Sequence, residues 1–242
     1  MNIVDYLILA ILGFGLLSGM HKGSITSGLN TLGFVASWFG AQRLYARIAN
    51  FALSNTTLMA VLNQYLEPEE FFSSAAEATM AVSDVVAGGE SAISQAVSSV
   101  GPRFSFLSQS FSANIRTQAF EKLGISSMSD YLNQTLWVAV FNVLAFIAAF
   151  ALIYIVVSLL VNLLDHVVSF PVLRGFDWLV GGVLGLLRGS AVAVLVMAVL
   201  PSALSLVDPS LTAKFVDTSR LYGVIRQFDP LSVTQWINSL VG

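Results

Sequence analysis

The stretch at residues 136–164, LWVAVFNVLAFIAAFALIYIVVSLLVNLL, contains no charged side chain over 29 residues. A helix needs about 20 mostly apolar residues to cross the hydrocarbon core of a bilayer, so this stretch predicts a transmembrane helix. Its extra length predicts that the helix is tilted or protrudes from the bilayer. The whole chain fits this environment, because 56% of its 242 residues are hydrophobic and only 10% are charged. Soluble domains carry roughly 25% charged residues.

Three further stretches predict membrane helices. Residues 3–20 and 25–44 are separated by a polar turn that contains His21 and Lys22. Residues 176–200 form the last stretch, and Pro201 is expected to end its helix. Together with residues 136–164, these stretches predict an all-α, polytopic membrane protein with about four transmembrane helices.

The residues between the second and third predicted spans have a different composition. Residues 45–133 hold eight of the fourteen acidic residues and are rich in serine and alanine. This predicts a helical extramembrane insertion, with helices near 69–86, 91–100 and 104–123 that pack together or lie on the membrane surface. In the last of these, one helical face carries the apolar residues Phe104, Leu107, Phe111, Ile115 and Phe120.

The sequence therefore predicts four segments along the chain. They are transmembrane helices at 1–44, the extramembrane segment at 45–133, transmembrane helices at 134–207 and an amphipathic tail at 208–242. In the tail, Leu221, Val224, Ile225 and Phe228 fit one face of a helix, which predicts a surface or interfacial element.

Glycines recur at every fourth position in two of the predicted spans. The triplets are Gly15, Gly19 and Gly23 in the first span and Gly181, Gly185 and Gly189 in the fourth. Residues four apart share one face of a helix, so each triplet removes the side chains from a stripe. Such stripes allow close backbone approach in membranes, and they predict helix packing.

Four charged residues lie in or beside the spans and are candidate functional residues. They are Asp5, Lys22, Asp177 and Arg188. Asp5 is expected to meet lipid headgroups or water, since it lies one turn inside the first span. In both the first and the fourth spans, an Asp-aromatic-Leu triplet precedes a G-x-x-basic-G motif. The triplets begin at Asp5 and Asp177, and the number of residues between triplet and motif differs between the two spans. This partial symmetry leaves an inverted repeat open as an alternative.

Arg188 lies within the fourth span, where a lone cation costs about 2.5–3.5 kcal/mol on insertion scales. One solution is a re-entrant half-helix at residues 177–187, with the true span beginning near residue 189. Another is an ion pair with Asp5 or Asp165. A third is a displaced helix that lets the side chain snorkel to the interface. The functional alternative is that Arg188 lines a polar path.

Several classes of protein are not supported by the sequence. The chain has no cysteine and two histidines, so no metal site or cofactor is expected. A net charge of −3 without a basic cluster argues against binding of nucleic acid. Since no catalytic motif is present, the protein is not expected to be an enzyme.

Short motifs in the spans resemble those of a known family. PVLRGFD at 171–177 is followed by GGVLGLLRG at 181–189, and the chain also has VD at 4–5 and GMHKG at 19–23. With the long third span, these motifs resemble the colicin V production protein (CvpA) family of bacterial inner-membrane proteins. Lys22 stands where the family often has arginine, and Asp177 where it often has Asp or Asn. The resemblance covers the four spans and part of the tail, and residues 45–133 look like an insertion.

The resemblance implies a protein of the bacterial cytoplasmic membrane that is involved in toxin or bacteriocin production and envelope processes. It implies no molecular activity. An accessory or scaffold protein is one expectation, with the bilayer and a homo-oligomer or other membrane proteins as partners. A small oligomeric transporter or channel that uses Arg188 and the glycine stripes is the alternative. The family pattern places both termini and residues 45–133 outside.

Overall fold

The computed structural model describes residues 1–63, 71–100, 102–167 and 176–227. These residues form helices, and the only pairings of β type among them are the isolated bridges Phe72–Val100 and Ala81–Ser127. The all-α prediction is therefore confirmed for the described residues. The elements in chain order are α1 Ile3–Leu53, α2 Thr56–Asn63, α3 Ala75–Thr79, α4 Val82–Ala87, α5 Gly89–Ser98, η2 Pro102–Leu107, α6 Ser108–Thr117, η3 Glu121–Leu123, α7 Met128–Val167, α8 Asp177–Val207, α9 Pro209–Leu211, η4 Thr212–Val216 and α10 Arg220–Gln227.

Three helices in the described part of the chain, α1, α7 and α8, are long and apolar enough to cross a membrane. Membrane-helix character is thus confirmed, whereas the count of four spans is not. The difference arises because the first two predicted spans are joined in α1, which has 51 residues. The helices α7 and α8 correspond to the other two predicted spans.

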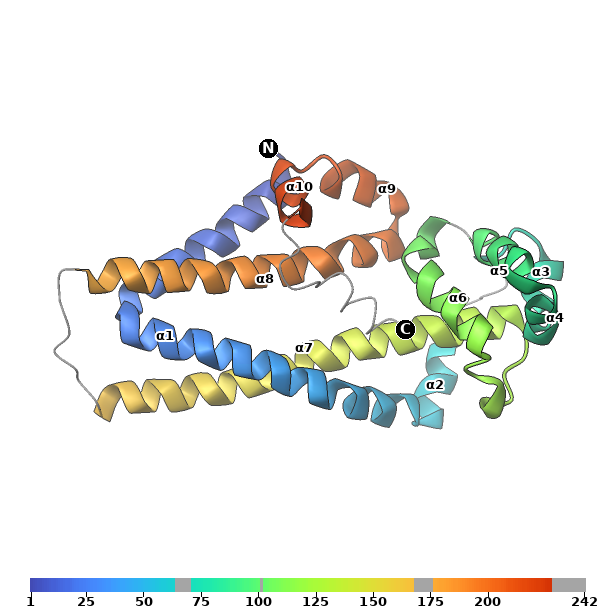
Figure 1. The fold of residues 1–242 in the computed structure, drawn as a ribbon, viewed down its shortest axis with the longest axis horizontal. Coiled ribbons are helices and arrows are strands. Elements are labelled where there is room, and N and C mark those ends of the chain that lie inside the picture. Colours follow the sequence, from blue (N-terminus) through green and yellow to red (C-terminus); the bar gives the residue numbers. More distant parts are fainter. Residues whose placement is uncertain (64–70, 101, 168–175, 228–242) are drawn as a thin grey trace. The chain divides into compact units, whose positions relative to one another are not determined.

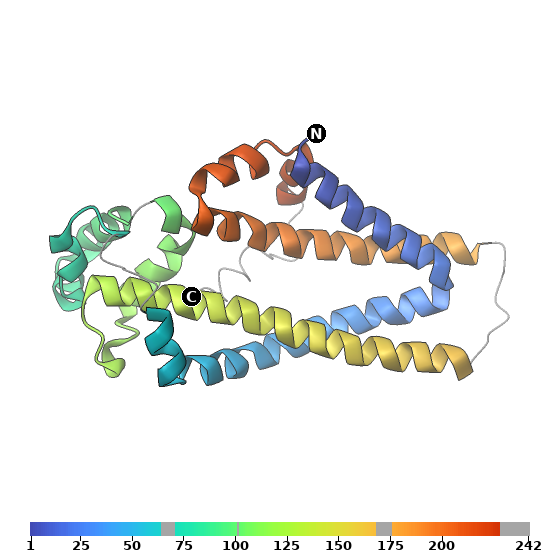
Figure 2. The same ribbon diagram turned by 180° about the vertical axis from the view of Figure 1, so that it is seen from behind.

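The backbone of α1 leaves helical geometry at Gly23, where φ is 76° and ψ is 177°. Glycine adopts this conformation readily because it has no Cβ. The Ser27 hydroxyl donates to the Gly19 carbonyl oxygen at 3.0 Å. Residues eight apart would be separated by about 12 Å along a straight helix, so the chain reverses here. Figures 1 and 2 show the two arms of α1 on either side of Gly23, which meet at the bend and diverge from it.

The helix α8 continues through Pro201 to Val207. The prediction that Pro201 ends the helix is wrong, and so is the alternative of a re-entrant half-helix at 177–187. An internal proline costs a helix about 3 kcal/mol, and tertiary packing can offset that cost. Here Met197 and Leu200, just before the proline, pack with Val4 and Ile8 of α1.

The chain divides into two compact units. The long-helix unit contains residues 1–44, 146–204 and, in the described part, 210–227. The short-helix unit contains residues 45–145 and 205–209. In the short-helix unit, Phe104, Leu107, Phe111, Ile115 and Phe120 are all buried. Their prediction as one apolar face is confirmed, and the short helices pack on one another around it.

Two predicted helices of the short-helix unit are interrupted. Residues 69 and 70 of the prediction at 69–86 lie outside the described part, and the rest contains α3 and α4 as separate helices, because the backbone between them pairs with residues 126–128. Val82 N donates to Ser126 O at 2.8 Å, and Met128 N donates to Met80 O at 3.0 Å. The prediction at 104–123 is divided into η2, α6 and η3, and α6 ends at Thr117, just before Gln118, whose φ is 49°.

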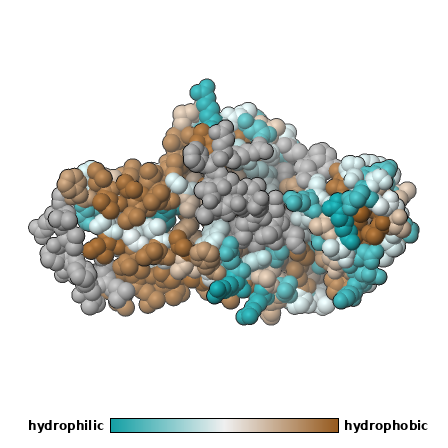
Figure 3. Space-filling model, viewed as in Figure 1, coloured by the Kyte–Doolittle hydropathy of each residue, from teal (hydrophilic) through white to brown (hydrophobic). Residues whose placement is uncertain are grey.

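The surface of the long-helix unit is strongly apolar, and brown dominates the long helices in Figure 3. Large side chains such as Phe14, Leu152 and Leu159 are exposed there. Polar side chains of the second arm of α1 point inward instead, and Thr26, Ser27, Asn30 and Ser37 are buried. This inverted arrangement suits a hydrocarbon environment, where exposed apolar side chains carry no penalty.

Candidate functional site

The two glycine triplets face each other in the long-helix unit, and all six glycines are buried. A Cβ built on Gly15 would lie 2.6 Å from the Gly185 carbonyl oxygen and 3.0 Å from the Gly189 Cα. A Cβ on Gly181 would lie 2.5 Å from the Gly19 carbonyl oxygen and 2.7 Å from the Gly23 carbonyl carbon. The glycine of α1 with the lowest residue number, Gly15, therefore meets the glycine of α8 with the highest, Gly189, and the two stripes run antiparallel.

This geometry places one backbone directly against the other. Attractive contacts between carbon atoms have their optimum at about 3.5–4.0 Å. The distances at these glycines are shorter, so no side chain fits without separating the helices. By contrast, a Cβ on Gly13, in the same arm of α1, would meet nothing within 4 Å. Gly13 therefore lies away from the face that the two triplets share.

Asp177 lies at the first residue of α8, next to the bend of α1. Its Oδ1 accepts a hydrogen bond from the backbone N–H of Ser24 at 2.8 Å and another from the Ser24 hydroxyl. Ser24 begins the second arm, where the first N–H groups of a helix have no intrahelical acceptor. The Asp177 carboxylate therefore caps this arm from a different helix, and it holds the start of α8 at the bend.

Asp5 has an equivalent role at the other end of the glycine interface. It is 0% exposed, and its Oδ1 accepts from the Ser219 hydroxyl at 2.6 Å and from Leu221 N at 3.0 Å. Its Oδ2 accepts from Asn2 N at 2.8 Å. The carboxylate thus caps the start of α10. The expectation that Asp5 meets headgroups or water is wrong, because the tail folds back and covers it.

The tail is attached by further contacts to the beginning of α1. The Asn2 side-chain amide donates to Phe215 O at 2.7 Å and to the Thr218 hydroxyl at 2.9 Å. Leu221 and Ile225 of α10 pack on an apolar cluster centred on Val4, Ile8 and Met197. In the sequence, α10 was expected to be a surface or interfacial element. The structure packs Leu221 and Ile225 of that face on α1 and α8, whereas Val224 is exposed, and residues from 228 lie outside the described part.

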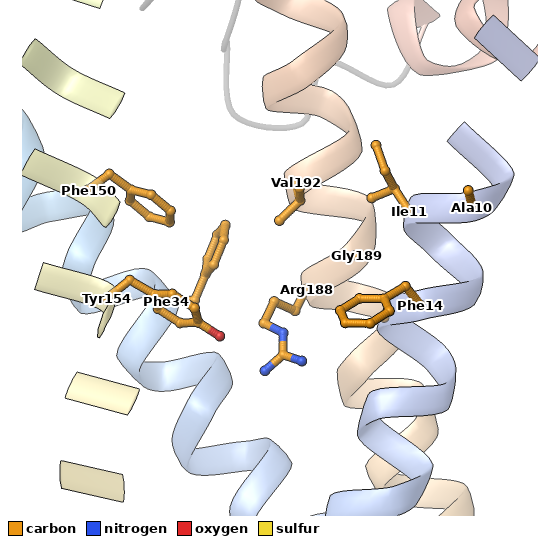
Figure 4. Close-up of a pocket in the computed structure, with 10 residues that line it drawn as sticks. Ala10, Ile11, Phe14, Phe34, Phe150, Tyr154, Arg188, Gly189 and Val192 are labelled. Carbon is orange, nitrogen blue, oxygen red and sulfur yellow. The ribbon is translucent and has the colours of Figure 1, made fainter. Parts of the chain in front are cut away.

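Arg188 faces a cavity of about 460 Å³ in the long-helix unit. Figure 4 shows its guanidinium group directed into this space, between Phe14 on one side and Tyr154 and Phe34 on the other. Its NH2 group lies 3.4 Å from the Ser18 hydroxyl, a weak contact at most. No ion pair of Arg188 exists among the described residues, so the pairing with Asp5 is wrong; the side chain of Asp165 lies outside them.

The structure thus brings some predicted residues together and leaves others apart. Asp177 joins the glycine interface at the bend, and Asp5 lies beyond its other end, 0% exposed. Lys22 lies at the bend without an ion-pair partner among the described residues. Sequence reasoning missed Ser24 and Ser219 as partners of the two carboxylates. A serine at a helix start is a signal for a cap, but nothing in the sequence identifies its partner in another helix.

The two carboxylates beside the glycine interface hold helices together. Within the described ranges, no group of three or more His, Asp or Glu side chains could hold a metal ion. The two buried or half-buried carboxylates are occupied by hydrogen bonds from helix starts. Arg188 differs from them, because it faces a cavity.

Comparison with known proteins agrees with the motifs. The model of the family described as colicin V production protein matches residues 4–89 and 92–230. This match includes nearly all of residues 45–133, so the interpretation of that segment as an insertion is not confirmed. No curated protein and no solved structure matches the chain. Because the match covers most of the sequence, the chain belongs to the colicin V production protein family.

Proposed function

We propose that the protein is a non-enzymatic accessory or scaffold protein of the bacterial inner membrane. Its role would be to support toxin or bacteriocin production and envelope processes. The observation that carries this proposal is the contact between the two glycine stripes. A Cβ on Gly185 would lie only 2.8 Å from the Gly19 Cα, so this helix pair leaves no space for a path between its members. A tightly packed pair of this kind favours a structural role.

The proposal includes a topology. The first arm of α1, residues 3–22, has about the length needed to cross a bilayer, and the second arm is longer. With α7 and α8, the two arms give four crossings, with the bend and the start of α8 at one face. Both termini and residues 45–133 would then lie at the opposite, outer face. Partners would be other membrane proteins or further copies of the chain, which meet the exposed apolar side chains.

A small oligomeric transporter or channel is the second candidate. The observation that favours it is the cavity that Arg188 faces. Against a water-filled path stands the chemistry of the cavity wall. Among the residues that line it, only Arg188 and Tyr154 carry polar side chains. Ion pathways are instead lined by carbonyl groups or by rings of charged side chains.

The two candidates differ in which substitution removes function. A host strain that lacks the gene would be complemented with Gly185→Leu, Arg188→Leu or the control Gly13→Leu, and secreted toxin activity would be measured. A scaffold predicts that Arg188→Leu and Gly13→Leu support production, whereas Gly185→Leu fails. A transporter predicts that Arg188→Leu abolishes production. Immunoblots of isolated membranes establish that each variant is present.

A further inference from the structure

The cavity beside Arg188 has features of a ligand site. Its volume of about 460 Å³ falls within the roughly 300–1,000 Å³ that is typical of small-molecule pockets. All of its walls belong to the long-helix unit. Phe34, which is 6% exposed, pairs edge to face with Phe150 at 5.0 Å between ring centroids. Phe14, on another wall, is 77% exposed, so the cavity opens to the surroundings of the helices.

Arg188 is not electrostatically satisfied by the described residues. Its only hydrogen bond there is the 3.4 Å contact with Ser18, and no described carboxylate pairs with it. It lies eleven residues from Asp177, or roughly 16 Å along α8. A cation at such a depth in an apolar helix is costly unless an anion or water accompanies it. A bound anion would supply the missing partner.

The chemistry of the walls restricts the kind of anion. Arg188 and Tyr154 are the two lining residues with polar side chains, and one guanidinium group matches a single compact anionic group. The remaining lining is apolar and matches a hydrocarbon chain. A guanidinium group binds a carboxylate through two parallel hydrogen bonds. A carboxylic acid can also reach this depth in its neutral form and release its proton to water, whereas a phosphodiester headgroup remains charged and costly to bury.

From this geometry we propose that the cavity binds a long-chain fatty acid from the surrounding bilayer. Its carboxylate pairs with Arg188, and its chain lies along Phe14, Phe34 and Phe150. Gly15 and Gly189 also line the cavity, so the site adjoins the glycine interface, but the proposal does not rest on the scaffold role. A fatty acid fits the site better than a phospholipid, because the site offers one cation and few other polar groups for a larger headgroup.

The test uses the full-length protein in phosphatidylcholine nanodiscs. The probe is a palmitic acid that carries a photoreactive diazirine in its chain, and the matched probe is the corresponding palmityl alcohol. Labelled residues are located by mass spectrometry. The variants are Arg188→Met, Arg188→Lys, Val192→Trp to fill the cavity with Arg188 retained, and Arg43→Met as a control that removes an exposed cation elsewhere.

The acid is expected to label residues 10–14, 34 and 188–192. Loss of a charge-assisted hydrogen bond predicts that Arg188→Met weakens labelling about tenfold or more, while Arg188→Lys retains part of it. Val192→Trp also loses labelling, and Arg43→Met does not. Equal labelling by the acid and the alcohol would overturn the proposal, as would unchanged labelling in Arg188→Met. Competition by phosphatidylglycerol but not by unlabelled palmitate would overturn it in favour of a phospholipid site.

Discussion

Replacement of Gly185 by alanine adds one methyl group at the point where α1 and α8 are closest. The new Cβ would lie 2.8 Å from the Gly19 Cα and 3.0 Å from the Gly19 nitrogen, and still closer to the Gly15 carbonyl oxygen. All three atoms belong to the backbone, so no side chain can move aside. The helices must separate until these distances approach about 3.5 Å, and the neighbouring glycine contacts weaken with them.

The expected change in the free energy of unfolding of Gly185→Ala is the sum of two opposing contributions. Overpacking of a well-packed interior costs about 1–3 kcal/mol. Alanine also stabilises a helix relative to glycine by about 0.8–1.0 kcal/mol. The substitution Gly13→Ala isolates the second term, because its Cβ would meet nothing within 4 Å. Subtracting one variant from the other leaves the overpacking term, so Gly185→Ala should be about 1–3 kcal/mol less stable than Gly13→Ala.

The free energy of unfolding is measured by titration of the purified protein in mixed micelles with sodium dodecyl sulfate, followed by tryptophan fluorescence. The account predicts that Gly13→Ala is as stable as the parent protein or slightly more stable, and that Gly185→Ala is clearly less stable. Equal stabilities for the two variants would refute the reasoning, because the helices would then have room that the structure does not provide.

Three further predictions concern the bend, the tail and the short-helix unit. Gly23→Ala places a Cβ on a residue with φ of 76° and ψ of 177°, a conformation essentially restricted to glycine, and against the Asp177 carboxylate. It should cost about 1–3 kcal/mol in the same titration, and no loss would mean that the bend lies elsewhere. Asp5→Asn removes the charged acceptor of Ser219 and Leu221, and amide hydrogen exchange at residue 221 should accelerate about tenfold, while unchanged exchange would argue against the cap. The hydrogen bonds from Arg116 lower the pKa of Glu90 in the folded protein. The ion pair therefore stabilises the fold fully at a pH above the unfolded-state pKa of Glu90. This stabilisation is lost as the pH falls through the lower pKa of the folded state. Thermal unfolding should show the parent more stable than Glu90→Gln near neutral pH and equal to it in acid, and a difference that persists in acid would contradict this assignment.

Much of the fold can be predicted from the sequence because membrane helices have a simple local signal. The uncharged stretch at 136–164 lies within α7, and the apolar face from Phe104 to Phe120 forms the buried side of its unit. Spacing also places each glycine triplet on one helix face. It cannot determine that the two faces meet, or that they run antiparallel, because that depends on how the chain folds between them.

The parts that sequence reasoning missed depend on partners distant in the chain. Ser219 lies 214 residues from Asp5, and no local pattern links the two. Four polar residues of the predicted span at 25–44, Thr26, Ser27, Asn30 and Ser37, are buried, which composition alone cannot distinguish from exposure to water. Pro201 is a local signal that misleads, because packing of Met197 and Leu200 offsets its effect on α8.

The helix α1 reverses at Gly23, and the proposed topology has both of its arms crossing the membrane. Because the chain has no cysteine, single cysteines can be placed at His21 and Ser91, which are both exposed, and tested in intact cells with a membrane-impermeant thiol reagent. The account predicts that Ser91→Cys is labelled in intact cells and that His21→Cys is labelled only after permeabilisation. Labelling of both positions from the same side, or no labelling of His21→Cys under either condition, would contradict the reversal.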